Sequence, residues 1–337
     1  MNNIFRLLVN RYKSRGLRRY VAKHYGLSIS EIIDAVTVKL SRECSETISR
    51  SEYRNLGGVN NMGILLHYNS SEHPFALTKL QSAVFAEREW RFQRWQEDHC
   101  KSVLAPNAYA YGLFPGKVFG WVTSECLLNI KAHEAEKIVS LYNLLDVDPD
   151  NLKSLSLSGS FDKLPDEIIP DTKIKSILTY LVSGTGDDEC VRFMRQYLSD
   201  RNYLLRSLLS NDDVTNLIAG IFPTSGITLG LVHGDFKHQN IMKSRTGELK
   251  IIDLQYYTYG RRIWDIAFYA SKDNGSIYSW FNLLNETGSV SRSDLELFLM
   301  YYLVAAIINV KKKRSRSVIE RKLRPCVELM RMKGVLK

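Results

Sequence analysis

The stretch between Leu229 and Ala270 places the strongest constraint on the fold of this 337-residue chain. Two short apolar runs in it each lead into an acid: the first into Asp235 and the second, Leu249–Ile252, into Asp253, with Asn240 between them. Apolar runs separated by a Thr-Gly turn predict two short strands, so we expect the three polar side chains to lie close together. Two carboxylates and an amide oxygen suit Mg²⁺, and a carboxylate that does not bind the metal can accept a proton from a hydroxyl.

The same residues allow two other interpretations. In the first, Asp235 and Asn240 only satisfy a buried turn, but this leaves the regular spacing of the polar residues unexplained. In the second, His233 and His238 form a metal centre, which is disfavoured because no third soft ligand stands nearby. Magnesium binding, with one carboxylate free to accept a proton, therefore remains the preferred hypothesis.

The motif H-G-D-x-x-x-x-N (His233–Asn240), followed by Ile252-Asp253 and Trp264-Asp265, resembles the aminoglycoside phosphotransferase and choline kinase family, relatives of the protein kinases. The resemblance covers about residues 47–310. It implies an α+β, protein-kinase-like two-lobed fold, with a small antiparallel-sheet N-lobe, a larger helical C-lobe and ATP in the cleft. It further implies ATP and Mg²⁺ as cofactors and transfer of the γ-phosphate to a hydroxyl of a small molecule.

The resemblance also assigns a role to each polar residue of the motif. Asp235 is expected to be the catalytic base, Asn240 and Asp253 the metal ligands, and His233 the residue that supports the catalytic loop. Lys237 matches the lysine that neutralises the transferred phosphoryl group in serine/threonine protein kinases. The later aspartate of the W-D pair is expected to bond the loop backbone rather than the substrate.

Residues that would hold the nucleotide stand earlier in the chain. The turn from Gly57 to Gly63 resembles the family's phosphate-covering turn, and Gly57, Gly58 and Asn60 in it are expected to let backbone N–H groups approach phosphate oxygens. Taken alone, such a turn is far more often a plain hairpin. Thr123–Cys126 resembles the segment between the lobes that reads adenine with backbone groups, so Glu125 is predicted to contact the base.

Lys79 occupies the place of the strand lysine that pairs with nucleotide phosphates in the family. Alternation along the predicted strand 75–80 puts Phe75, Leu77 and Lys79 on one face, where a lysine needs an anionic partner. The alternative is a lysine on a solvated edge strand, with no partner required. The two interpretations differ in whether an acid lies beside the ammonium group.

The helix predicted over residues 81–98 offers two acids, Glu87 and Glu89, as the partner of that lysine. Glu89 is preferred, because it falls at helical spacing with two phenylalanines on one apolar stripe. The sequence does not decide between the two glutamates.

Two alternatives to a small-molecule kinase remain. A protein kinase is supported by Lys237 but opposed by I-D-L-Q in place of D-F-G, and by the 11 residues between Asp253 and Asp265, which leave no room for a long activation loop. A non-catalytic kinase-like binding module would be expected to have lost Lys79 or one of the motif's polar residues, and all are present. For the acceptor we expect a sugar or a cell-surface saccharide precursor, because the H-G-D-F form and basic ends resemble family members associated with bacterial polysaccharide synthesis.

The net charge of +10 is concentrated at the two ends of the chain. Residues 1–30 contain seven bases and no acid, and residues 311–337 contain eleven bases and two acids, so the middle carries a net negative charge. Basic ends of this kind are either solvated helix faces or contacts for an anionic partner, such as a membrane surface. Nucleic acid is disfavoured, because no aromatic-interleaved basic ribbon accompanies the charge.

The remaining patterns indicate a cytoplasmic protein, with a peripheral position at the inner face of the membrane as an option. Five scattered cysteines without a C-x-x-C pair are typical of free thiols. The apolar run 297–310 is shorter than the ~20 residues that span a bilayer and is interpreted as a buried helix. The expected domains are a basic, mostly helical extension (1–46), a nucleotide-binding N-lobe (47–124) and a helical C-lobe (125–337).

Overall fold

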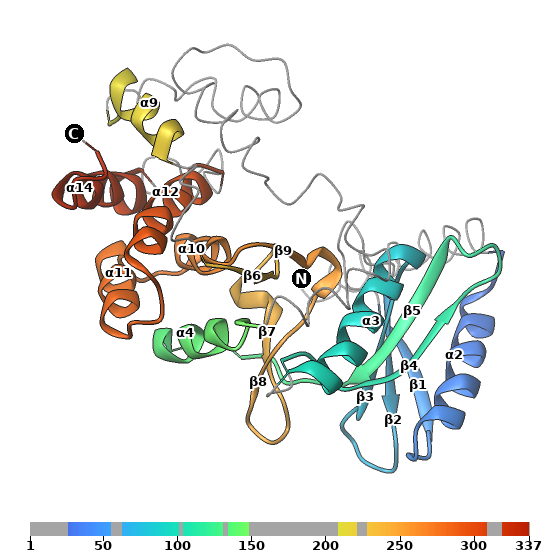
Figure 1. The fold of residues 1–337 in the computed structure, drawn as a ribbon. Helices are drawn as coiled ribbons and strands as arrows, with labels where there is room; N and C mark the ends of the chain where they lie inside the picture. The colour runs from blue at the N-terminus through green and yellow to red at the C-terminus, as the bar shows by residue number, and fades with distance from the viewer. Residues whose placement is uncertain are drawn as a thin grey trace, which may run out of the picture. The chain divides into compact units, whose positions relative to one another are not determined.

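The computed structural model describes residues 26–54, 63–100, 104–130, 134–147, 208–220, 228–308 and 319–336. The chain divides into two compact units (Figure 1). Unit 1 comprises Met1–Asn129 and Met242–Gln255, and unit 2 comprises Ile130–Ile241 and Tyr256–Lys337.

Residues 242–255 group with the sheet of unit 1, although the expected domain boundaries place them in the helical part. They carry the antiparallel pair β7 (Ile241–Lys243) and β8 (Leu249–Ile251). Backbone hydrogen bonds join Lys243 to Leu128, and the N–H of Ile251 donates to the carbonyl of Leu104 at 2.7 Å. These bonds attach the hairpin to residues 104–128, which explains its membership of unit 1.

Unit 1 is built on a five-stranded antiparallel sheet with the strand order β1-β2-β3-β5-β4. Its strands are β1 (Arg50–Arg54), β2 (Gly63–Tyr68), β3 (Ala76–Ser82), β4 (Ala108–Leu113) and β5 (Phe119–Glu125). Short apolar or alternating runs in the sequence predict strands at 47–56, 64–68, 75–80 and 117–123, and these correspond to β1, β2, β3 and β5. The sequence analysis missed β4.

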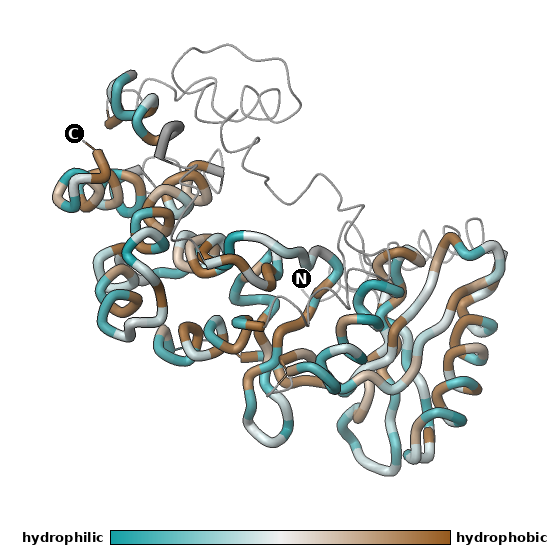
Figure 2. Tube along the Cα trace, in the orientation of Figure 1, coloured by the Kyte–Doolittle hydropathy of each residue, from teal (hydrophilic) through white to brown (hydrophobic). Residues whose placement is uncertain are grey.

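Helix α2 (Ile29–Glu43) covers one face of this sheet (Figure 1). Ser28 caps its first turn, in a reciprocal arrangement with Glu31 that satisfies two backbone donors. Hydrophobic and hydrophilic residues alternate along this helix (Figure 2). Its apolar side chains at a spacing of four residues are all buried: Ile32, Val36 and Leu40. They pack on sheet residues such as Leu65 and Trp121, and each such burial stabilises the fold by about 1.5–3 kcal/mol.

A row of hydrogen-bonded polar side chains crosses the α2 side of the sheet, and we call it the polar row. The hydroxyl of Ser51 lies 2.8 Å from Nδ1 of His67, and Nε2 of His67 lies 2.7 Å from Oγ1 of Thr78. Thr78 in turn hydrogen-bonds Thr123, and Thr37 of α2 lies 3.1 Å from Ser51. Because both ring nitrogens have partners, His67 can be fully buried, and this burial lowers its pKa to about 4.

Helix α3 (Ala83–His99) packs on the opposite face of the sheet from α2 (Figure 1). Its N-cap is Ser82, the last residue of β3, whose hydroxyl accepts from the N–H of Phe85. The inward face of α3 is unusually polar, with Glu89, Gln93 and Gln96 all buried. A buried polar face needs partners, and it finds them on β3, on β5 and in the backbone of Ala105.

Unit 2 is mainly helical in its described part. It contains the antiparallel strand pair of β6 (Leu229–Val232) and β9 (Thr258–Arg261). Its described α-helices are α4 (Ala135–Asn143), α9 (Asn211–Gly220), α10 (Ile263–Lys272), α11 (Ile277–Glu286), α12 (Arg292–Ile308) and α14 (Arg324–Met332). The helices predicted over 131–145, 212–221 and 294–310 correspond to α4, α9 and α12. Those predicted over 172–182 and most of 187–208 lie outside the described residues.

Residues 297–308 of the long apolar run lie in α12, and residues 297–307 are all buried in unit 2. This confirms the predicted buried helix. Among the residues with a described structure, no helix is both long and apolar enough to cross a membrane.

Candidate active site

Lys79 lies on β3, opposite Ile64 of β2 and Val122 of β5, on the face of the sheet that carries α3. Leu77 shares this face and packs with an apolar cluster that includes Ile64. The sequence analysis was wrong about Phe75, which packs in the cluster under α2 on the other face. The reason is that β3 begins only at Ala76, so strand alternation does not extend back to Phe75.

The Lys79 ammonium group lies between two carboxylates within unit 1. Its Nζ atom is 3.4 Å from Oε2 of Glu89 and also contacts Oδ1 of Asp253. The side chains of Lys79 and Glu89 are only 15% and 8% exposed. Burial lowers the pKa of Lys79, but the two nearby carboxylates outweigh this and the net pKa is raised, so the lysine is charged.

The structure distinguishes the two glutamates that the sequence left open. Glu89 faces Lys79, whereas Glu87 points outward on α3 and pairs with Arg91 one turn later. The Glu87–Arg91 pair is half-exposed and of the ordinary i, i+4 type, which contributes little to stability.

Asp253 lies two residues after the end of β8 and holds an unusual backbone conformation. Its φ angle is +67°, the left-handed region in which aspartate is tolerated better than most other non-glycine residues. Strained backbone of this kind is stored at functional sites when the surroundings hold it in place. Here the contact with Lys79 fixes the carboxylate beside a cation.

The loop after β6 in unit 2 is organised by a buried carboxylate. Asp265 in α10 is fully buried and accepts hydrogen bonds from the backbone N–H of His233 at 2.5 Å and of Gly234 at 3.0 Å. Burial raises the pKa of Asp265 to about 7, against the lowering effect of these two donors. Gly234 has a φ of +85°, so a glycine is required where the chain turns toward Asp235.

The side chains that follow in this loop converge on Asp235. The amide nitrogen of Asn240 donates to the carbonyl of Asp235 at 2.9 Å and to its Oδ2 atom at 3.1 Å. Lys237 pairs with the same Oδ2 atom. The N–H of Asp235 donates to Nδ1 of His233 at 3.2 Å, and His233 packs edge-on against the buried ring of Phe236. Within unit 2 the structure therefore brings Asp235, Lys237, Asn240 and His233 into one hydrogen-bonded loop.

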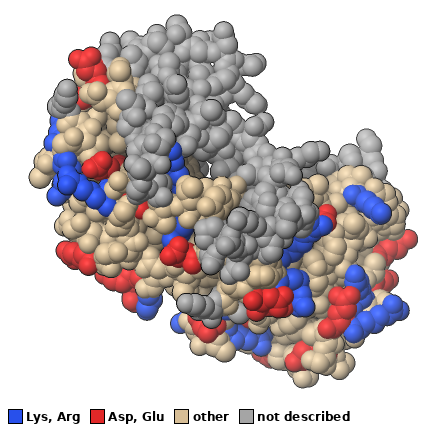
Figure 3. All heavy atoms as spheres, viewed as in Figure 1, with Lys and Arg blue, Asp and Glu red and all other residues tan. Residues whose placement is uncertain are grey.

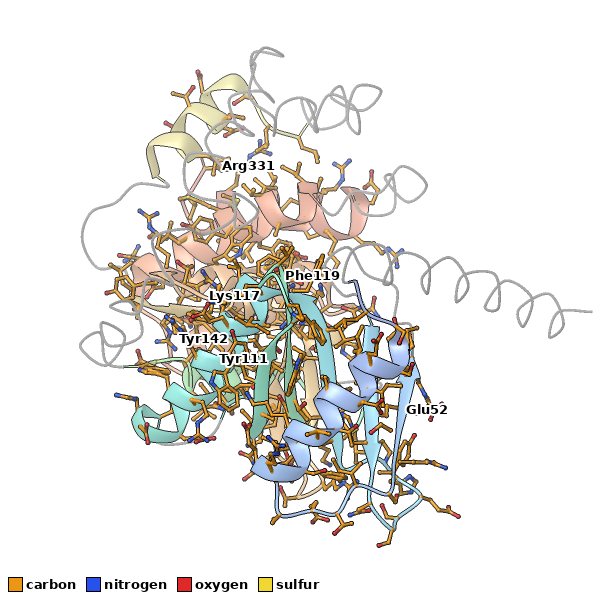
Figure 4. The ribbon with its side chains drawn as sticks, turned by 90° about the vertical axis from the view of Figure 1, so that its right-hand side faces the viewer. Glu52, Tyr111, Lys117, Phe119, Tyr142 and Arg331 are labelled. Carbon is orange, nitrogen blue, oxygen red and sulfur yellow. The ribbon has the colours of Figure 1, made fainter. Side chains whose placement is uncertain are left out.

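Arg262 connects this loop to α4. Its buried guanidinium donates to the carbonyl of Tyr142 at 2.9 Å, lies 4.8 Å from the centre of that ring and pairs with Asp146 at 2.7 Å (Tyr142 is labelled in Figure 4). A Cβ at Gly230 would come within 2.5 Å of the arginine stem, so the glycine on β6 makes room for it. The start of α10, and with it Asp265, is thereby fixed against a neighbouring helix.

The segment predicted to read the base ends β5. The carboxylate of Glu125 accepts from the N–H of Asn107 at 3.1 Å, and the N–H of Glu125 donates to the carbonyl of Asn107. The N–H of Cys126 bonds the carbonyl of Phe75, and that of Leu128 bonds Lys243. These three N–H groups are engaged within unit 1, so base recognition by this segment would have to use other groups.

Sequence reasoning missed one residue at the lysine site, Gln81. Its side-chain nitrogen donates to Oε2 of Glu89 at 2.8 Å, the same oxygen that faces Lys79. The available signal was strand alternation, which puts residues 79 and 81 on one face of β3. The predicted phosphate-covering residues Gly57, Gly58 and Asn60 lie outside the described residues.

The oxygen donors of these residues are of the kind that Mg²⁺ binds together with phosphate oxygens and water. In the described ranges, no group of three or more His, Cys, Asp or Glu residues could hold a metal ion. Mg²⁺ usually takes one or two carboxylates and completes its shell with phosphate oxygens and water. Within unit 1, Asp253 offers a carboxylate, and the buried Oε1 atom of Gln255 has no hydrogen-bond partner in the described part of the chain. Within unit 2, Asn240 offers an amide oxygen.

A model of the phosphotransferase enzyme family matches residues 195–282 of this chain. That stretch contains the loop at Asp235 and Asn240 together with Asp253 and Asp265. The chain resembles the phosphotransferase enzyme family. The resemblance seen in the H-G-D-x-x-x-x-N motif is thus confirmed over the segment that carries it. A comparison with curated proteins found no match.

Three solved structures are similar to the chain over nearly its whole length. A choline kinase from Cryptosporidium parvum Iowa II has a TM-score of 0.51 at 16% identity, covering 91% of this chain and 97% of that one. A choline/ethanolamine kinase family protein from Mesorhizobium loti gives 0.50 at 10%, covering 89% and 99%. A spectinomycin phosphotransferase in complex with ADP and spectinomycin gives 0.50 at 11%, covering 92% and 94%. Identities this low show the fold alone, and the predicted α+β, kinase-like fold is confirmed.

Proposed function

We propose that this protein is an ATP-dependent phosphotransferase that moves the γ-phosphate to a hydroxyl group of a small molecule. The observation that carries the proposal is the mostly buried Lys79 ammonium group held between Glu89 and Asp253. A charge costs free energy when it leaves water, so a buried lysine beside two acids is kept where its charge is used. An ammonium group suits phosphate oxygens, and a neighbouring carboxylate suits magnesium.

The family match supports the same chemistry, because it spans the loop of unit 2 in which Asp235 is positioned. The names of the structural relatives point to small acceptors: choline, ethanolamine and spectinomycin. The proposal takes from them only the class of acceptor, a small molecule with a free hydroxyl.

Each residue then has a proposed task. Lys79 holds phosphate oxygens, and Glu89 fixes the lysine. Asp235 orients the acceptor hydroxyl and accepts its proton at the carboxylate, while Asn240 and Asp253 would hold magnesium. Magnesium ATP supplies the phosphoryl group and neutralises its charge when bound. Catalysis would come mainly from positioning and from charge neutralisation.

Lys237 has a task of its own in this proposal, because its ammonium group contacts the Asp235 carboxylate directly. We propose that it neutralises the phosphoryl group during transfer. The protein kinase alternative draws support from Lys237, but residues 254–261 are occupied by a short 3-10 turn and by β9, which pairs with β6. A long peptide-binding loop therefore has no place between Asp253 and α10.

The acceptor class is proposed from the sequence resemblance: a sugar or a saccharide precursor of the cell surface. The test is ADP release from magnesium ATP in the presence of monosaccharides, lipid-linked saccharides, choline, ethanolamine, an aminoglycoside or bulk protein. We expect a saccharide to stimulate ADP release more than bulk protein does. Stimulation by protein alone would favour the protein kinase alternative.

A pair of aspartate variants tests the catalytic assignment. Asp235→Asn should retain nucleotide binding and lose most of the turnover, because the amide cannot accept the proton. Asp212→Asn, at an exposed position of α9 in the same unit, serves as the matched control and should behave as wild type. Wild-type protein that neither binds nucleotide nor releases ADP would contradict the proposed function.

A further inference from the structure

Gln81 is a buried amide at the lysine site to which no role has been given. It lies on β3 two residues after Lys79, and its side chain is fully buried. Its Nε2 atom donates to Oε2 of Glu89 at 2.8 Å, and the same oxygen lies 3.4 Å from the ammonium group of Lys79. One carboxylate oxygen is therefore held by two donors from the same strand face.

The direction of the amide is fixed by chemistry. Only the NH₂ end can face a carboxylate, because a carbonyl oxygen there would repel it. The other end, Oε1, is consequently left without a hydrogen-bond partner in the described part of the chain. A buried acceptor without a partner destabilises the fold, so an apolar side chain of the same shape would fill this position at least as well. Packing alone therefore does not account for a glutamine here.

A second donor to Glu89, the amide of Gln81, matters because Lys79 has two carboxylate partners. Lys79 contacts both Glu89 and Asp253, so the ammonium group is shared between two carboxylates. When a phosphate competes for the lysine, the bond from Lys79 to Glu89 weakens. Gln81 carries no charge, and Glu89 is the one carboxylate that its amide bonds within the described ranges, so this bond stays in place.

We propose that Gln81 is a positioning residue that keeps Glu89 directed at Lys79 when the lysine binds phosphate. The proposal rests on the proposed function, since it assumes that Lys79 holds nucleotide phosphates. Its consequence is that loss of the amide donor weakens nucleotide binding without weakening the fold.

The experiment compares two glutamine-to-methionine variants of the full-length chain. Gln81→Met keeps the length of the side chain and removes both the donor and the unpaired oxygen. Gln96→Met is the matched control: Gln96 is equally buried in the same unit, but its amide bonds only the backbone of Ala105. Thermal melting gives stability, and calorimetric titration with magnesium ADP gives nucleotide affinity without any need for the acceptor.

We expect Gln81→Met to melt close to the wild-type temperature, because removal of the unpaired Oε1 offsets the lost bond to Glu89. It should bind magnesium ADP about tenfold more weakly, the change that corresponds to one hydrogen bond to a charged group at the weak end of its range. Gln96→Met should melt at a lower temperature with unchanged affinity. Wild-type affinity in Gln81→Met, or an equal loss in both variants, would overturn the positioning role. Absence of binding by the wild type would instead refute the proposed function.

A second variant keeps the proposal testable if Gln81→Met does not fold. Gln81→Glu places a second carboxyl against Glu89: ionised, the two repel each other, and with one shared proton the pair reproduces the amide donor. Its affinity for magnesium ADP should therefore recover toward the wild-type value as the pH is lowered. A ratio of wild-type to variant affinity that does not change with pH would overturn the proposal.

Discussion

The polar row under α2 yields a quantitative prediction about pH, because its central member is a histidine that folds in the neutral form. Burial lowers the pKa of His67 from 6.5 to about 4, and both ring nitrogens bond hydroxyl groups, Ser51 on one side and Thr78 on the other. Since the folded-state pKa lies below the unfolded one, folding favours loss of the proton. The stabilisation is complete above about pH 6.5 and is lost as the pH falls toward 4.

The size of the effect follows from the two pKa values. A difference of about 2.5 units corresponds to about 3 kcal/mol, since each unit is worth about 1.4 kcal/mol. His67 is fully buried, so solvent screening does not reduce this figure appreciably. A loss of about 3 kcal/mol is a large fraction of the stability of an ordinary domain.

The variant His67→Gln isolates the contribution of His67 protonation to the free energy of unfolding, because glutamine can donate and accept hydrogen bonds in the polar row but does not titrate. We would measure the free energy of unfolding by denaturant titration between pH 4 and 8 for the wild type, for His67→Gln and for His73→Gln, an exposed control. The difference between the wild type and His67→Gln should shift by about 3 kcal/mol in favour of the variant between pH 7 and pH 4. Parallel curves for these two proteins would refute the reasoning.

Two further predictions concern the site. Lys79→Met should weaken binding of magnesium ADP at least about tenfold, because the phosphates lose a charged partner, whereas Lys243→Met at an exposed position should not; equal titration curves for the two variants would contradict the role of Lys79. Gly234→Ala and Gly26→Ala both place a Cβ on left-handed backbone, with φ angles of +85° and +64°, and each should lose about 1–2 kcal/mol in denaturant titrations. Only Gly234→Ala should also lower phosphotransfer, because Gly234 leads the chain into Asp235; unchanged turnover in that variant would separate the loop from catalysis.

Local hydropathy patterns and residue types in the sequence were sufficient to predict several helices and strands. The segment that forms α3 contains no glycine or proline, and β2 is a short run of apolar residues between polar turns, so both could be read from the sequence. Strand β4 (AYAYGL) could not, because half of its residues are alanine or glycine, which favour strands weakly. Its pairing with β5 stabilises it, and this is a tertiary contact that no local window contains.

The candidate site was predictable in its residue types and less so in its contacts. The family resemblance pointed to Lys79 and to an acid on the following helix, but the choice of Glu89 over Glu87 depends on how α3 is rotated on the sheet. The contact between Lys79 and Asp253 joins residues 174 positions apart. Strand alternation puts Gln81 on the same face of β3 as Lys79, but the sequence does not show that its amide bonds Glu89.

The backbone at Asp253 determines which substitutions can be interpreted there. Asparagine, like aspartate, visits left-handed φ values, so Asp253→Asn would report on the missing negative charge alone. Alanine or a β-branched residue would add a conformational penalty at the same position, and a loss of activity would then have two causes. Mutational scans that use only alanine would overstate the electrostatic contribution of this carboxylate, and the asparagine variant corrects that bias.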